Sequence, residues 1–134
     1  MTIRLVFPDP LEWQSGLEWG VEAAAILVRE GHDVECVFRA TGPMFEAVAF
    51  AALDLGILDR CTFDDTAVGK PSTDDIVVLP RVNVELRDIA QPPPLWPEVR
   101  ATAEGVRKVV STEQTSWSRS PSLLAAAIQA VAKS

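Results

Sequence analysis

The first 38 residues constrain the fold of this chain more than any other segment. A short apolar run, IRLVF at 3–7, is broken by prolines and followed by the small-residue turn Ser15-Gly16. An alanine-rich stretch then closes on the Gly-His-Asp turn at 31–33, and a second apolar run comes directly after it. Strand, loop, helix and strand in this order form a βαβ unit, so the segment predicts two parallel strands connected by a helix that covers one face of the sheet.

The rest of the chain continues the alternation of strands and helices. Apolar runs predict strands at 3–7, 34–38, 61–63, 76–79 and 108–111, and helical spacing with glycine or proline punctuation predicts helices at 17–29, 41–56, 97–105 and 121–131. The polar segment 64–75 is expected to be a loop. This pattern favours an α/β fold, a three-layer α/β/α Rossmann-like sandwich with a mostly parallel sheet of four or five strands. Right-handed crossovers make 3-2-1-4-5 the expected strand order.

Composition narrows the classes of partner. A chain of 134 residues is expected to form one domain spanning 1–134. The net charge of −7 disfavours binding to nucleic acid or to an anionic membrane surface, and leaves small molecules and proteins as partners. The longest unbroken apolar run, 47–53, is far shorter than the roughly 20 residues of a membrane span. With no signal peptide in the sequence, a cytoplasmic location is expected.

The candidate binding site follows from the fold. In open α/β sheets, ligands bind beyond the carboxyl ends of the strands, near the point where the strand order reverses. Polar or small residues that follow the predicted strands are therefore the candidate ligand-binding residues: Asp9, Ser15, Gly16, Arg39, Thr41, Arg81, Asn83, Thr112 and Glu113.

Two kinds of contact are possible there. Arg39 and Arg81 each closely follow an apolar strand, where a guanidinium can hold a carboxylate or phosphate through two hydrogen bonds; the alternative is an ordinary surface ion pair. Ser15-Gly16 precedes a helix and could offer N–H groups and a hydroxyl to an anion, or could simply be a capping turn. Neither a dinucleotide-binding nor a P-loop glycine pattern is present, so no cofactor is expected.

Other reactive residues point to structural roles. His32 is the only histidine and lies in the turn before the second strand, on the side opposite the crevice. The acid pairs at 64–65 and 74–75 are expected to be solvated loop residues rather than metal ligands, and no metal site is predicted. Cys36, inside a strand, is expected to be a buried free thiol. Trp13 and Trp117 follow strands and could meet above the sheet, but packing or a partner interface is favoured for them. The catalytic residues stay unassigned.

Three segments resemble a known family. The opening SGLEWGVEAAAILVREGHDVECVF, the run DDIVVLPR at 74–81 and the run VVST at 109–112 resemble the amino-terminal domain of glycosyltransferases with two Rossmann-like domains, the GT-B type. In that family this domain binds the acceptor and a following domain binds the nucleotide-sugar. The resemblance therefore implies an acceptor-binding domain that is inactive alone, as one half of a split glycosyltransferase or as part of a larger one, and that needs a donor-binding partner.

Two alternatives remain open. One is a non-catalytic homo-oligomeric α/β interaction or regulatory module, with the proline-rich segment 91–97 and exposed tryptophans such as Trp96 at its interface. The other is a small sulfur-relay protein, because DsrE-like proteins share a similar size and opening and use a reactive cysteine; Cys61 is the candidate here.

Overall fold

A computed structural model describes residues 2–9, 11, 15–80, 108–111 and 121–133. The elements in chain order are β1 (Thr2–Val6), α1 (Leu17–Arg29), β2 (Asp33–Phe38), α2 (Phe45–Asp54), η2 (Leu58–Arg60), β3 (Cys61–Phe63), α3 (Asp65–Gly69), β4 (Ile76–Leu79), β5 (Lys108–Ser111) and α5 (Pro121–Ala132). These elements confirm the predicted α/β class. The helix expected at 97–105 lies outside the described residues.

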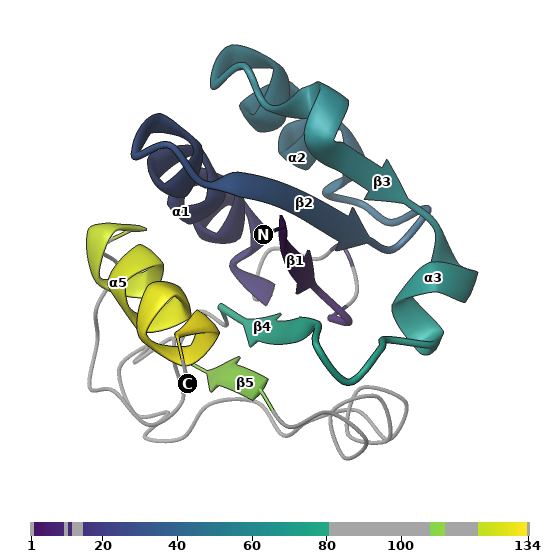
Figure 1. The fold of residues 1–134 in the computed structure, drawn as a ribbon. Coiled ribbons are helices and arrows are strands. Elements are labelled where there is room, and N and C mark those ends of the chain that lie inside the picture. Colours follow the sequence, from purple (N-terminus) through teal and green to yellow (C-terminus); the bar gives the residue numbers. More distant parts are fainter. Residues whose placement is uncertain (1, 10, 12–14, 81–107, 112–120, 134) are drawn as a thin grey trace, which may run out of the picture.

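The strands form one parallel sheet in the order β3-β2-β1-β4-β5 (Figure 1). The longest pairing joins β1 and β2, from Thr2↔Asp33 to Val6↔Val37, and β5 pairs with β4 along its whole length. After β1, the strands β2 and β3 are added on one side of β1, and β4 and β5 are then added on its other side. The order therefore reverses between β1 and β4, and their carboxyl ends mark the crevice.

Helices cover both faces of the sheet. Helices α1, α2 and α5 lie along one face, with α1 between the other two (Figure 1). Alternate strand residues such as Leu5, Cys36 and Val78 point into this layer and form the main core with the helices. On the other face, α3 packs its Val68 against Val6 and Val37. The arrangement is the Rossmann-like sandwich that the sequence predicts.

Glycines end both long helices of the first half as expected. Gly31, with φ of 94°, follows the last turn of α1, and the N–H of His32 donates to Leu27 O at 3.0 Å. Gly56 ends α2 in the same way, with the N–H of Ile57 bonded to Ala52 O. In each case a left-handed residue lets the chain reverse while the last carbonyls stay hydrogen-bonded.

Two local predictions were wrong. Helix α2 begins at Phe45, not at Thr41, because the N–H of Met44 donates to Leu11 O at 2.8 Å and holds 41–44 as a turn against the first loop. The predicted loop 64–75 contains the short helix α3, because the Asp64 carboxylate accepts from the N–H groups of Thr66 and Ala67. Within the described ranges, no helix is long and apolar enough to cross a membrane.

Candidate functional site

Loops from three strands meet at the carboxyl ends of β1, β2 and β4. Gly16, at the N-terminus of α1, lies directly on the carbonyl oxygen of Pro80, which follows β4, and a Cβ at Gly16 would overlap that oxygen. Gly42, after β2, also packs closely on Leu11 from the first loop, where a Cβ would lie 2.6 Å from the Leu11 Cβ and 2.8 Å from the Leu11 carbonyl oxygen. Glycine therefore lets the backbones that surround the predicted crevice approach one another without side chains between them.

Arg39 joins the ends of β1 and β2. Its Nε donates to the carbonyl oxygen of Pro8 at 3.0 Å, so the guanidinium of a residue that follows β2 lies over the residue that follows β1. The side chain is half-buried, and among the described residues its two Nη groups have no hydrogen-bond or ion-pair partner. Arg39 thus presents two N–H-bearing nitrogens of a fixed, permanently charged group at the crevice.

Two polar residues of the loop between β1 and α1 are buried. Asp9, three residues after the end of β1, is fully buried, and Ser15 is only 1% exposed just before α1. Ser15 Oγ has no hydrogen-bond partner in the described part of the chain, and it does not cap α1, whose N-cap is Gly16. A hydroxyl buried without a partner costs free energy of roughly 1–3 kcal/mol, so a ligand hydroxyl or a water that pairs with Ser15 Oγ would recover that free energy.

A row of aromatic rings forms the floor below these loops. Phe7, Phe38 and Phe63 lie at or just past the ends of β1, β2 and β3, and their rings stack in succession with centroids 4.6 and 5.3 Å apart. Phe45, at the start of α2, meets Phe63 edge-on at 4.9 Å. Sequence reasoning missed this row, although a phenylalanine at the end of each of three neighbouring strands was its signal. The packed floor holds the crevice loops in place.

The other predicted site residues divide into two groups. Thr41 is exposed and its side chain does not cap α2. The neighbouring N–H of Ala40 donates to Asp65 Oδ1 at 3.0 Å, which ties the loop after β2 to α3. The remaining candidates, which lie outside the described residues, are Arg81, Asn83, Thr112 and Glu113. The same holds for Trp13, Trp96 and Trp117 and for the proline-rich segment 91–97.

Asp64, Asp65 and Asp74 are exposed as predicted, whereas the prediction of a solvated residue is wrong for Asp75, because it is buried in an ion pair. Asp64 caps α3, and Asp65 holds Ala40. Asp75 is buried and pairs with Arg4 at 2.6 Å, while its carboxylate also accepts from the N–H of Ser72. No group of three or more metal-ligating side chains occurs within the described ranges.

His32 lies at the amino end of β2, away from the crevice. Its Nε2 lies 2.9 Å from Gln129 Nε2, so it links the turn after α1 to α5. The predicted position opposite the crevice is confirmed, and the contact is one between structural elements.

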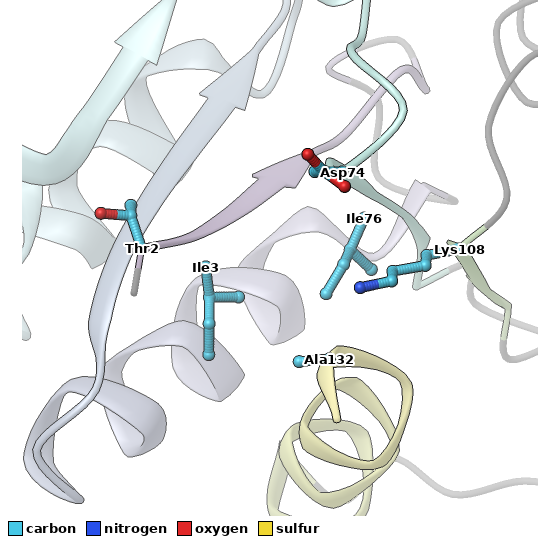
Figure 2. A pocket seen from close by; sticks show the side chains of 6 residues that line it. All are labelled: Thr2, Ile3, Asp74, Ile76, Lys108 and Ala132. Carbon is cyan, nitrogen blue, oxygen red and sulfur yellow. The ribbon is translucent and has the colours of Figure 1, made fainter. Parts of the chain in front are cut away.

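A separate hollow of about 350 Å³ opens at the amino ends of the strands. Figure 2 shows Ile76 and Lys108 pointing toward the last residues of α5, with Asp74 on the other side of the opening. The hollow mixes one acid, one base and apolar side chains, and it lies at the opposite end of the sheet from Arg39.

Comparisons with protein-family models, with curated proteins and with solved structures find no match for this chain.

Proposed function

We propose that this chain is an acceptor-binding domain of the glycosyltransferase kind, which holds a hydroxyl-rich small molecule with an acidic group above the carboxyl ends of β1 and β2. Arg39 carries the proposal. Its Nε is fixed on Pro8 O, and within the described residues its two Nη groups have no partner and can bind an anion. A planar guanidinium held in this way suits two parallel hydrogen bonds to one carboxylate or phosphate.

The position of Arg39 in the fold supports the same function. Ligands of open α/β sheets bind where the strand order reverses, and here that point lies between β1 and β4. Gly16 and Pro80 touch at this point, Ser15 directly precedes Gly16, and Asp9 is buried in the loop after β1. Asp9 and Ser15 are the buried polar residues of the loop after β1, so they are the candidates for holding sugar hydroxyls.

On this proposal the chain acts with a second, donor-binding domain or subunit. None of its described loops carries the glycine pattern that holds a nucleotide diphosphate, so the proposed division of labour leaves the nucleotide-sugar to the partner. The isolated chain is then expected to bind acceptor-like molecules weakly and to leave a nucleotide-sugar unbound.

Amide NMR titration of the whole chain tests this proposal with a matched pair of probes. p-Nitrophenyl β-D-glucuronide carries the carboxylate that Arg39 requires, and p-nitrophenyl β-D-glucoside lacks it. The glucuronide is expected to bind with a Kd on the order of 1 mM and to shift the signals of Ser15, Gly16 and Arg39, with smaller effects from the glucoside. Equal effects of both probes, or shifts confined to the amino ends of the strands, would overturn the proposal.

The surface of α2 favours a second candidate, a homo-oligomeric interaction module. Phe50 and Leu53 on this helix are 62% and 56% exposed, and Leu55 follows them. A hollow of about 410 Å³ beside them is lined by Leu53, Gly56, Leu58 and Asp59. Sedimentation equilibrium distinguishes the two functions. A stable dimer that Phe50→Glu dissociates would support the module, whereas a monomer at all concentrations would remove it.

A further inference from the structure

The two cysteines of this chain lie side by side on neighbouring strands. Cys36 of β2 and Cys61 of β3 are register partners in the parallel pairing of these strands. Partners in a parallel ladder project from the same face, and adjacent strands lie about 4.8 Å apart. A disulfide requires Cα atoms about 4.4–6.8 Å apart, so the backbone spacing is already suitable for a bond between the two sulfurs.

The two thiols differ in exposure and in acidity. Cys36 is 1% exposed in the core, whereas Cys61 is half-buried at the start of the edge strand. The hydrogen bond between the two thiols lowers the pKa of Cys61. The same hydrogen bond, with burial, raises the pKa of Cys36. Cys61 is therefore the thiol that ionises first and the one that a small oxidant reaches.

The location permits the small movement that bond formation needs. Strand β3 has three residues and lies at the edge of the described sheet, next to β2. Among the described residues, the Cys61 thiol makes one weak hydrogen bond outside the pair, which it donates to Ile57 O at 3.4 Å. An edge strand this short can shift by a few tenths of an ångström without disturbing a second ladder.

We propose that Cys36 and Cys61 form a cross-strand dithiol that hydroperoxides oxidise to an intramolecular disulfide, with Cys61 as the sulfur oxidised first. The Cys61 thiolate attacks one peroxide oxygen and the O–O bond breaks. Cys61 becomes a sulfenic acid, and the released alkoxide (hydroxide when the oxidant is hydrogen peroxide) takes up a proton to give an alcohol (or water). The Cys36 sulfur then attacks the Cys61 sulfur, and the S–O bond breaks. The hydroxide leaves as water with the Cys36 proton, so two electrons pass from the thiols to the peroxide.

The test treats the reduced, folded chain with one equivalent of hydrogen peroxide and follows its intact mass and its free thiols. Both thiols are expected to disappear together with a mass loss of about 2 Da, and dithiothreitol is expected to restore them. Peptide mapping without reductant should join the peptides that contain Cys36 and Cys61. Two thiols that stay reduced, or a covalent dimer through Cys61, would overturn the proposal.

Single-cysteine variants assign the order of the steps. In Cys36→Ala, Cys61 should gain about 16 or 32 Da as a sulfenic or sulfinic acid, because the second sulfur is missing. In Cys61→Ser, the buried Cys36 should stay reduced over the same time. Oxidation of Cys36 in Cys61→Ser at the wild-type rate would contradict the assignment. Circular dichroism checks that each variant is folded. If a variant does not fold, the oxidation assay on the wild-type chain still tests whether the disulfide forms.

Discussion

Gly16 at the start of α1 lies directly against the carbonyl oxygen of Pro80 after β4. At the point where the strand order reverses, two backbone segments therefore touch with no side chain between them. Gly16 also adopts a φ of 64°, which other residues rarely take. The geometry of the crevice therefore depends on a residue that has no side chain.

Gly16→Ala is expected to destabilise the chain by about 2–4 kcal/mol, since the new Cβ meets a backbone oxygen and the left-handed conformation costs a further 1–2 kcal/mol. Gly31→Ala is the matched control. Gly31 also has a positive φ, but a Cβ there would meet nothing within 4 Å. Urea unfolding should show a loss in Gly31→Ala of about 1 kcal/mol. Equal losses in the two variants would contradict the close contact.

The aromatic floor gives a second prediction. Phe38 lies between the rings of Phe7 and Phe63 and is fully buried. Phe38→Ala should lower the free energy of unfolding by about 3–5 kcal/mol, because it removes a buried ring from the middle of a stack. Phe50→Ala, on the exposed face of α2, should lower it by less than about 1 kcal/mol. A comparable loss from both substitutions would show that the stack is not central to the core.

The ion pair between Arg4 and Asp75 is a third point to test. Asp75 has a side chain only 5% exposed and lies 2.6 Å from Arg4. Asp75→Asn should destabilise the chain by about 1–3 kcal/mol in chemical denaturation, because one end of the pair is buried while Arg4 is partly solvated. Asp33→Asn removes an exposed acid that pairs with Arg60, and a smaller change is expected. The reverse ranking would contradict the burial of the first pair.

Asp33 also predicts a pH dependence. Hydrogen bonds from Thr2 and then Arg60 hold the pKa of Asp33 below its usual value of 3.8. A lowered pKa in the folded state stabilises the fold above the unfolded-state pKa, and this contribution is lost as the pH falls below 3.8 through the folded-state value. The stability advantage of the wild type over Asp33→Asn should therefore shrink over that acidic range. An advantage that grows on acidification would contradict these contacts.

Ser15→Ala tests whether the Ser15 hydroxyl contributes to the stability of the fold. Because Ser15 Oγ is buried and has no partner within the described residues, its removal should leave the free energy of unfolding unchanged or raise it by up to about 1 kcal/mol. Thermal unfolding measures the difference. Clear destabilisation would mean that the hydroxyl has a structural partner.

The sequence predicted the sheet better than the loops, for physical reasons. Helix α1 and the strands β4 and β5 have the predicted bounds, because apolar periodicity and glycine ends act within each segment. The start of α2 depends on Met44 bonding to Leu11, a contact across the chain that no local pattern contains. The helix α3 could have been predicted, since Asp64 is an ordinary N-cap residue in front of it.

The sequence predicted which residues lie near the site, but it predicted few of the contacts that these residues make. The strand-end rule selected Arg39, but only the fold places its Nε on Pro8, with no partner for its two Nη groups in the part of the chain that the structure describes. Likewise, Ser15 and Gly16 were identified as a turn that could bind an anion, whereas the contact of Gly16 with Pro80 depends on β4, 60 residues further along the chain. Such long-range contacts do not follow from residue types alone.

The most direct test of the central claim compares two arginine variants in binding p-nitrophenyl β-D-glucuronide. Arg39→Gln removes the charge at the crevice, and Arg60→Gln removes one at the amino ends of the strands, where Arg60 pairs with Asp33. The account predicts that Arg39→Gln weakens binding about tenfold or more while Arg60→Gln leaves the Kd unchanged. Equal affinity of Arg39→Gln and the wild type would contradict it.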